Sequence, residues 1–476
     1  MNRIIQVLGT SSDSGKTTLV MALCRYFSNR GYKVSPFKGV NMSLNSISIG
    51  DSSEISRAQW LQAIAARAKP DKHMNPFLLK PEGEGKSQLI VLGKSVGSLS
   101  IEKYYEYLNK NGYSIIRESL DFLLNKYDMV IAEGAGSAAE INMNGRDFSN
   151  IFVSSIYNTP AILVSDIDKG GVFASLYGTI KLMNRGDLVR YMVINKMRGN
   201  VEILDSGIKK LEGLTGKKVI GILPYLSDIK VPGEDSLNYT NEKISNNKIA
   251  VIKYPYMENY SDLDPFYLYN MGYKYITKDN VDDIDTAEVI VLPGSKMVFR
   301  DLEYVKKYGM DRKIIEKSET AKIIGICGGY QMLGKKIYDK NGIESNGEET
   351  ECLGLLDLET IYNNEKKVDE VRYTMNENIF GENEESLGYE IHYGTIINNN
   401  EKNMNVVNNG EEGACKKNIM GTNIHGIFEN MNFLKYIFNV KFPNYQEIMD
   451  GGIDDVTNSI MAHIDANLLN KLIEND

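Results

Sequence analysis

The chain has 476 residues, 42% of them hydrophobic and 25% charged, a composition that favours an ordinary globular protein of about two domains. Its 54 Lys and Arg against 63 Asp and Glu give 54 − 63 = −9, so we do not expect nucleic acid as a partner. We find no signal peptide, no apolar run of membrane-spanning length and no disulfide or metal spacing among four cysteines, which predicts a cytoplasmic protein without membrane partners.

Short apolar strands alternate with helical patterns along the first half of the chain. The expected strands are "RIIQVLG", "YKVSPFK", "SQLIVLG", "YDMVIAEG", "PAILVSDID", "VRYMVIN" and "KKVIGILPY". The expected helices cover residues 15–30, 54–68, 101–126, 172–183 and 202–214. Such alternation predicts a parallel sheet that is covered by helices on both faces.

A second alternating series follows a polar, irregular stretch that we interpret as a linker over residues 231–247. Its strands are "KIAVIKYPY", "AEVIVLPGS" and "AKIIGICGG". The sequence therefore predicts an α/β protein with two doubly wound parallel-sheet domains, residues 1–230 and residues 248–476.

The stretch "GTSSDSGKTT" lies between the first strand and the first helix, where a phosphate-binding loop would lie. Five residues separate Gly9 from Gly15, one more than in the usual pattern. Backbone N–H groups and the helix N-terminus would hold the phosphates of a nucleotide. The expected nucleotide-binding residues are Gly15, Lys16, Thr17 and Thr18, with Lys16 on the phosphates and the Thr17 hydroxyl on Mg²⁺.

A magnesium site also needs carboxylates. Glu133 ends the strand "YDMVIAEG", where a second acidic ligand is expected, and Glu54 is another candidate. Asn195 ends the strand "VRYMVIN" and is a candidate for binding the adenine edge of the nucleotide. A strand-end Glu can also be merely solvated, and a strand-end Asn can be a turn residue.

The segment "KIIGICGGYQMLG" combines a buried strand, Cys327, glycines and a helix, the pattern of a nucleophile elbow. The helix N-terminus favours a thiolate. The N–H of Gly328, helped by Gly294 in the upstream turn "LPGSK", would stabilise an oxyanion. The expected base is His425 in "GTNIHGIF". His392 in "GYEIHYG" is the rival base, and we favour a structural or substrate-positioning role for it.

The elbow, the glycine turn and the downstream His resemble class I glutamine amidotransferases, in which a cysteine releases ammonia from glutamine. The spacing of the phosphate-binding loop is similar to that of the dethiobiotin synthetase-like ligases. Together the two resemblances imply an amide ligase. ATP would convert a carboxylate into an acyl phosphate, which ammonia then attacks.

Almost the entire chain resembles the cobyric acid synthase family of cobalamin biosynthesis. The residues that carry this resemblance are "PFKGVNMSLNS", "EISRAQ", "MNPFLLKPEGEGKSQLIVLGK", "EGAGSAAEIN", "SDIDKGGVFASLYGT", "INKMRG", "LPGSK", "GICGGYQMLG" and "GYEIHYG". The resemblance implies amidation of the b, d, e and g carboxylates of adenosylcobyrinate a,c-diamide, with ATP, Mg²⁺, L-glutamine and the corrinoid as small-molecule partners. It also implies that Cys327 is the nucleophile and His425 its base.

Three acidic residues match acidic positions of the synthetase domain of that family, namely Asp147, Asp166 and Asp168. They are candidates for contacts with Mg²⁺ or substrate, or for loop caps. One position departs from the general class I pattern. In that pattern a Glu usually follows the His by two residues, but here the position is Ile427. Glu429 is the nearest candidate for the third residue of a Cys-His-acid triad. Unless another group takes the place of that Glu, we therefore expect a loosely held His425 and a slow glutaminase until the other domain is loaded.

Two other functions fit parts of the sequence. The sister enzyme that amidates the a and c carboxylates of cobyrinic acid shares both domain types, but the blocks "NMSLNS" and "MNPFLLKP" favour cobyric acid synthase. A non-catalytic P-loop switch of the partitioning-ATPase kind would leave the second half of the chain unexplained.

Overall fold

The computed structural model describes residues 3–83, 85–143, 147–227, 229–233, 248–345, 347–381, 385–407 and 410–473. These residues form two compact units. The first unit comprises Met1–Ser43, Ile55–Val231 and Asp450–Asp476, and the second unit comprises Leu44–Glu54 and Pro232–Met449.

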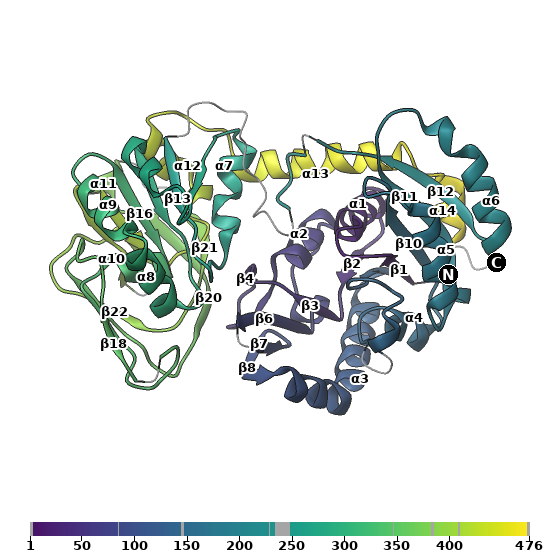
Figure 1. Ribbon diagram of the computed structural model, residues 1–476, viewed down its shortest axis with the longest axis horizontal. Helices are drawn as coiled ribbons and strands as arrows, with labels where there is room; N and C mark the ends of the chain where they lie inside the picture. Colours follow the sequence, from purple (N-terminus) through teal and green to yellow (C-terminus); the bar gives the residue numbers. More distant parts are fainter. Residues whose placement is uncertain are drawn as a thin grey trace. The chain divides into compact units, whose positions relative to one another are not determined.

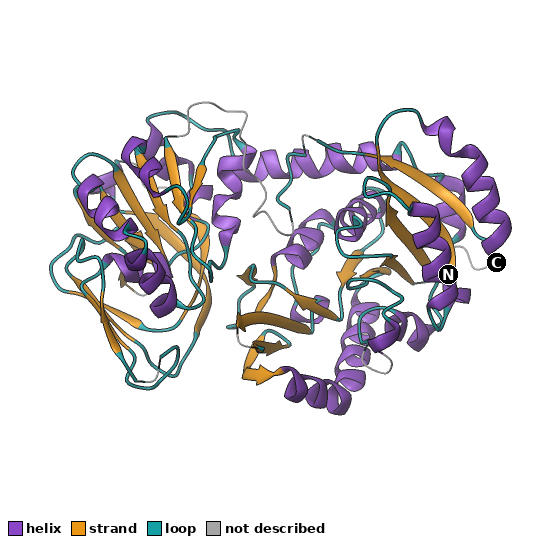
Figure 2. Cartoon of the chain, viewed as in Figure 1, coloured by secondary structure: helices purple, strands orange, loops and turns teal. Residues whose placement is uncertain are grey.

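The first unit is built on a six-stranded parallel sheet in the order β12-β11-β10-β1-β9-β2 (Figures 1 and 2). Every residue of the three central strands β10, β1 and β9 is buried, as expected when helices cover both faces of a parallel sheet. The strands are β1 (Ile4–Gly9), β2 (Val34–Phe37), β9 (Met129–Glu133), β10 (Ala161–Asp166), β11 (Val189–Met197) and β12 (Lys218–Pro224).

The helices of the first unit follow the apolar periodicity of the sequence. They are α1 (Lys16–Ser28), α2 (Arg57–Ala65), α3 (Ile101–Lys126), α4 (Ile151–Tyr157), α5 (Val172–Leu182) and α6 (Asp205–Thr215). The helix expected from residue 54 begins three residues later, because the Ser56 side chain caps α2 by accepting a hydrogen bond from the N–H of Ala58.

A second, four-stranded sheet in the first unit has the order β3-β6-β7-β8. Its strands are β3 (Val40–Met42), β6 (Phe77–Gly83), β7 (Lys86–Val91) and β8 (Lys94–Ser100). Only β7 was expected from the sequence. The antiparallel pairs of β7 with β6 and β8 were missed, because their short strands carry glycine and charged residues that weaken the period-two pattern.

The second unit contains a mainly parallel sheet in the order β14-β13-β15-β16-β26-β25, so the expectation of two doubly wound domains is confirmed. Its strands are β13 (Ile249–Ile252), β14 (Lys274–Ile276), β15 (Val289–Leu292), β16 (Lys322–Ile326), β25 (Ala414–Lys416) and β26 (Ile419–Thr422). The edge strand β25 is antiparallel to β26.

Two smaller sheets extend the second unit, with the orders β18-β17-β19-β22 and β21-β20-β23-β24. Their strands are β17 (Lys336–Tyr338), β18 (Glu349–Glu351), β19 (Leu358–Ile361), β20 (Lys367–Met375), β21 (Ser386–His392), β22 (Thr395–Asn398), β23 (Asn405–Val407) and β24 (Gly410–Glu412). The helices are α7 (Asp264–Leu268), α8 (Val298–Lys307), α9 (Met310–Lys317), α10 (Gly328–Leu333), α11 (Glu377–Phe380) and α12 (Met431–Phe438).

Two segments belong to a different unit than the expected domain bounds implied. Residues 44–54 belong to the second unit and contain strand β4 (Ser46–Ser48). The unit boundary falls after Glu54, the first residue of strand β5 (Glu54–Ser56). Helix α13 (Tyr445–Met461), yellow in Figure 1, begins in the second unit and ends in the first, followed there by α14 (Ala466–Lys471). The expected linker lies mostly outside the described residues, since only 231–233 of it are described.

The C-terminal segment belongs to the first unit because it satisfies buried groups there. The guanidinium of Arg25, on α1, has no exposed surface and forms ion pairs with Asp450 and Asp454 of α13. The N–H of Asp465 donates to the carbonyl of Ile220 in β12. No helix among the described residues combines the length and apolar character needed to cross a bilayer.

Candidate active sites

The loop between β1 and α1 has the conformation of a phosphate-binding loop. Gly15 has φ 96°, and a Cβ at this position would lie 1.9 Å from Nδ2 of Asn195, so only glycine fits. Lys16 Nζ donates to the carbonyls of Ser11 and Gly136 at 2.9 Å each, which holds the ammonium group over the loop. Asn195 Nδ2 donates to the carbonyl of Ser14 at 2.9 Å. Asn195 thus supports the loop, and its contact with adenine stays a prediction.

Glu133 lies beside the loop at the end of β9, as the sequence predicted. Its carboxylate is buried and accepts from Thr17 Oγ1 at 2.8 Å. Two residues that the sequence analysis missed complete this cluster. Lys38 Nζ forms an ion pair with Glu133 at 2.8 Å, and Gln62 Nε2 donates to the same carboxylate at 2.6 Å. The signal for Lys38 was a lysine directly after the buried strand β2, at the edge of the sheet where Glu133 also lies.

Thr17 and Glu133 offer the oxygen donors that Mg²⁺ prefers. No group of three or more His, Cys, Asp or Glu that could hold a metal ion exists among the described residues. Glu54, the other expected magnesium ligand, belongs to the second unit, so the structure does not place it in one unit with Thr17.

The other acidic candidates of the first unit have protein partners. Asp166 Oδ2 pairs with Lys196 Nζ at 2.9 Å, and Asp168 pairs with Arg198 at 2.8 Å. Asp147 Oδ1 accepts from the N–H groups of Ser149 at 3.1 Å and Asn150 at 2.8 Å, so it caps the turn before α4. A direct role for these three carboxylates toward Mg²⁺ or substrate stays a prediction.

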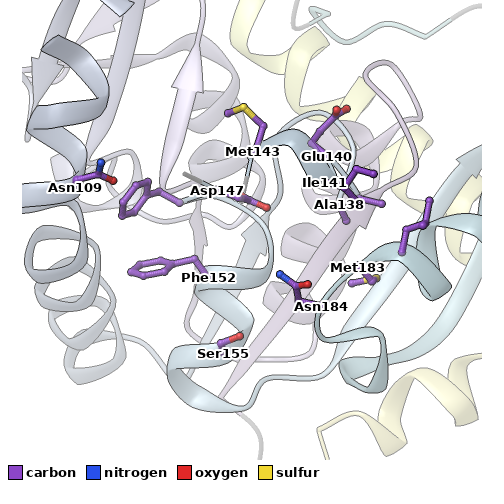
Figure 3. Close-up of a pocket in the computed structure, with 13 residues that line it drawn as sticks. Asn109, Ala138, Glu140, Ile141, Met143, Asp147, Phe152, Ser155, Met183 and Asn184 are labelled. Carbon is purple, nitrogen blue, oxygen red and sulfur yellow. The ribbon is translucent and has the colours of Figure 1, made fainter. Parts of the chain in front are cut away.

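Asp147 also lines a pocket between apolar side chains (Figure 3). The other residues that line it are Asn109, Ala138, Ala139, Glu140, Ile141, Met143, Phe148, Phe152, Ser155, Leu182, Met183 and Asn184. None of the described residues that line it is cationic.

The second unit places Cys327 in the sharp turn between β16 and α10. Its φ of 52° and ψ of −111° are strained for a residue with a side chain, as in a nucleophile elbow. The turn is held by the Cys327 N–H, which donates to the carbonyl of Thr422 at 2.8 Å. A Cβ at Gly329 would lie 2.0 Å from the carbonyl oxygen of Leu292, so the turn requires glycine there.

His425 is fully buried, and its Nδ1 lies 2.7 Å from Oδ2 of Asp262. The other oxygen of that carboxylate accepts a hydrogen bond from the N–H of Gly426 at 2.7 Å. The ring of Tyr389 stacks on the His425 ring, with 5.0 Å between the ring centroids. Burial by itself lowers the pKa of His425, but the Asp262 carboxylate and the neighbouring Cys327 raise it to about 10. The Nε2 atom, which is also buried, has no hydrogen-bond partner among the described residues.

Asp262 is therefore the carboxylate partner of His425 that the sequence analysis did not find. The loosely held His425 was expected only if no other group replaced the missing Glu, and Asp262 is such a group. Asp262 lies in the 3-10 turn Tyr260–Leu263, 163 residues before the histidine. Ile427 is buried in the core of the unit, while Glu429 Oε2 accepts from Gln446 at 3.3 Å. No local spacing signals Asp262, because it is one of three carboxylates in "ENYSDLD".

The two expected oxyanion glycines lie close to the two expected catalytic residues, Gly294 beside His425 and Gly328 directly after Cys327. A Cβ at Gly294 would lie 3.2 Å from Cε1 of His425, and a Cβ at Gly328 would lie 2.9 Å from the backbone nitrogen of Ser295. The role of their N–H groups stays a prediction. His392, the rival base, is buried in the wall of the pocket that contains Cys327, 3.7 Å from Glu390. Since Asp262 hydrogen-bonds His425, the geometry favours His425 as the base.

Known protein families match both halves of the chain. The family described as CobQ/CobB/MinD/ParA nucleotide binding domain matches residues 5–238, and the CobB/CobQ-like glutamine amidotransferase domain matches residues 248–433. Together the two domains define an ATP-dependent, glutamine-hydrolysing amidoligase. The chain is 55% identical to a "Probable cobyric acid synthase" of Picrophilus torridus and 52% identical to one of Thermoplasma acidophilum, with 97% of each chain covered in both comparisons. The chain belongs to the cobyric acid synthase family.

A more distant relative gives the same result. The chain is 37% identical to the "Cobyric acid synthase" of Caldanaerobacter subterraneus subsp. tengcongensis, over 99% of this chain and 98% of the relative. The similarity therefore extends over both units and over their connections.

Proposed function

We propose that this chain uses ATP and glutamine to amidate the b, d, e and g carboxylates of adenosylcobyrinate a,c-diamide. The printed names of the relatives support the choice of substrate. One observation supports the chemistry: in the second unit Asp262 holds His425 through a hydrogen bond, and in the first unit Thr17 contacts Glu133 beside the phosphate-binding loop. A cytoplasmic location stays a prediction.

The second unit would release ammonia from glutamine. Asp262 holds the Nδ1–H of His425, which leaves Nε2 for the reacting groups. A protonated His425 favours the thiolate of Cys327. The thiolate attacks the side-chain carbonyl of glutamine, His425 gives its proton to the departing ammonia, and a glutamyl thioester remains. His425 then takes a proton from water, which attacks the thioester and releases glutamate.

The first unit would activate the substrate carboxylate. A carboxylate oxygen attacks the γ-phosphorus of ATP, ADP leaves, and an acyl phosphate forms. Ammonia then attacks the acyl carbon, and inorganic phosphate leaves with the formation of the amide. Lys16 would stabilise the charge on the transferring phosphoryl group, and Lys38, beside Glu133, is placed to contribute a second positive charge.

Magnesium fits the oxygen donors of Thr17 and Glu133, which lie 2.8 Å apart. The ion would neutralise charge on the phosphates of bound ATP. The ammonium group of Lys38 and the hydroxyl of Thr17 both contact Oε1 of Glu133, which fixes the position of that carboxylate.

Mass spectrometry of the corrinoid product tests the proposal. Purified protein with ATP, Mg²⁺ and glutamine is expected to add amides to the a,c-diamide until the b, d, e and g positions are filled. Cobyrinic acid should be a poor substrate in the same assay. Amidation of cobyrinic acid at positions a and c instead would assign the chain to the sister reaction.

A further inference from the structure

The hairpin of residues 44–54 comes from the first half of the chain but belongs to the second unit. Its backbone is fixed there through Asn259, whose Oδ1 accepts from the N–H of Ser46 at 3.1 Å. Asp51 and Ser52 at its tip have positive φ values of 52° and 48°, in agreement with the tight turn. Asn259 directly precedes the 3-10 turn that carries Asp262. The hairpin is thus part of the structure around the glutaminase site.

Glu54 ends this hairpin with a buried carboxylate. Its side chain accepts from Ser46 Oγ at 2.8 Å and forms an ion pair with Lys366 Nζ at 2.5 Å. The Glu54 side chain is 1% exposed and that of Lys366 is 10% exposed. A buried ion pair of this kind fixes the position of the ammonium group, because separating its charges would leave each without compensation.

Lys366 also lines the pocket that contains Cys327. Lys296 is the other lysine among the lining residues, and it lies close enough to Glu344 to oppose the effect of burial on that carboxylate. Glu344 is held by the Tyr362 hydroxyl at 3.2 Å and by the N–H of Phe299 at 3.4 Å. The pocket therefore combines a nucleophile with a fixed cation and a fixed carboxylate.

This combination matches the substrate of the proposed glutaminase. With its side-chain amide at Cys327, glutamine presents a carboxylate and an ammonium group from the same carbon atom. Both groups need a charged partner in a pocket that excludes water. Lys366, held by the Glu54 carboxylate, and Glu344, held by the Tyr362 hydroxyl and the Phe299 N–H, meet these two needs.

We propose that Lys366 binds the α-carboxylate of glutamine, that Glu344 binds its α-ammonium group, and that Glu54 is a positioning residue that holds Lys366 in the pocket. This inference rests on the proposed glutaminase activity. It gives Glu54 a role in glutamine binding instead of the magnesium ligation expected from the sequence.

The test uses the full chain and measures glutamate release, which needs no corrinoid. Lys366→Met is expected to raise the KM for glutamine about 10- to 100-fold and to change kcat less than about threefold, because a charge-assisted hydrogen bond to bound substrate is lost. Glu54→Gln is also expected to raise the KM for glutamine, by a smaller factor than Lys366→Met. Asp51→Asn removes one exposed charge from the same hairpin and is the matched control, with wild-type kinetics expected.

Two truncated substrates separate binding from general damage. 4-Aminobutanamide lacks the α-carboxylate, so Lys366→Met should turn it over as well as the wild type does. Glutaramate lacks the α-ammonium group, so Glu344→Gln should discriminate less between it and glutamine. Equal losses by Lys366→Met on glutamine and 4-aminobutanamide would overturn the assignment of Lys366.

Amidation of the corrinoid with ammonium salt as nitrogen source distinguishes the two roles of Glu54. Glu54→Gln should retain wild-type ammonia-dependent amidation, because the acyl-phosphate step does not use the glutamine pocket. Equal loss with ammonia and with glutamine would assign Glu54 to the phosphate step and refute its role as a positioning residue. Failure of all corrinoid amidation, with glutamate release intact, would count against the proposed substrate and leave this inference standing.

Discussion

The contact of Asp262 with His425 allows a quantitative prediction. Replacing Asp262 with Asn keeps the size of the side chain and removes its charge. The surroundings of His425 raise its pKa from the ordinary 6.5 to about 10, chiefly through Asp262. A difference of this size corresponds to on the order of 5 kcal/mol of net interaction with the protonated ring. We therefore expect Asp262→Asn to reduce the kcat of glutamine hydrolysis by about 10²- to 10⁴-fold.

Two readouts distinguish this effect from a loss of folding. Corrinoid amidation with ammonium salt should be unchanged in Asp262→Asn, since only ammonia production needs His425. The alkaline limb of the pH profile for glutamate release should move to lower pH, because the imidazolium that protonates the leaving ammonia persists only up to its pKa. Glu429→Gln removes the alternative carboxylate and should resemble the wild type. A kcat of Asp262→Asn within about threefold of the wild type would refute the positioning role of Asp262.

Four further predictions follow from the two sites. Cys327→Ala should abolish glutamine-dependent amidation and spare the ammonia-dependent reaction; equal inactivity at high ammonium salt would contradict the division of labour. Lys16→Ala should lose about 30- to 1000-fold in rate with either nitrogen source, and near-normal turnover with ammonia would exclude the phosphate-binding role. Burial raises the pKa of Glu344 to about 8, so kcat/KM for glutamine should rise as the pH increases through about 8 and the carboxylate ionises, and Glu344→Gln should lack this rise. Because Asp262 already holds His425, glutamate release from glutamine alone should be close to the rate with Mg-ATP and corrinoid added, and a large stimulation would show that the site is assembled only after loading.

The motifs whose geometry is local could be read from the sequence. The phosphate-binding loop with Lys16 and the elbow with Cys327 each depend on a few consecutive residues, because glycines permit the turns and the adjacent strand and helix fix their direction. The parallel sheets could be predicted because their strands are continuous apolar runs in the sequence. Glu133 also belongs to this group, since the carboxyl ends of neighbouring parallel strands lie at one edge of a sheet.

Partners that come from distant parts of the chain could not be read in this way. The spacing pattern of class I amidotransferases restricted the search for a carboxylate partner of His425 to nearby positions. The partner in the structure is Asp262, which lies 163 residues before His425 in the sequence. The strand-end residue Lys38 and the helix residue Gln62 reach Glu133 only because their elements converge on the same sheet edge.

The sequence by itself determined the class of the protein and its two reactive motifs, because those depend on backbone turns built from adjacent residues. Only the tertiary structure decided which carboxylate holds His425 and where Glu54 lies. Long-range side-chain pairs have no period or spacing along the chain, since they depend on how separate elements pack. Glu54 illustrates the difference: the sequence made it a candidate magnesium ligand, whereas in the fold it belongs to the second unit and forms an ion pair with Lys366.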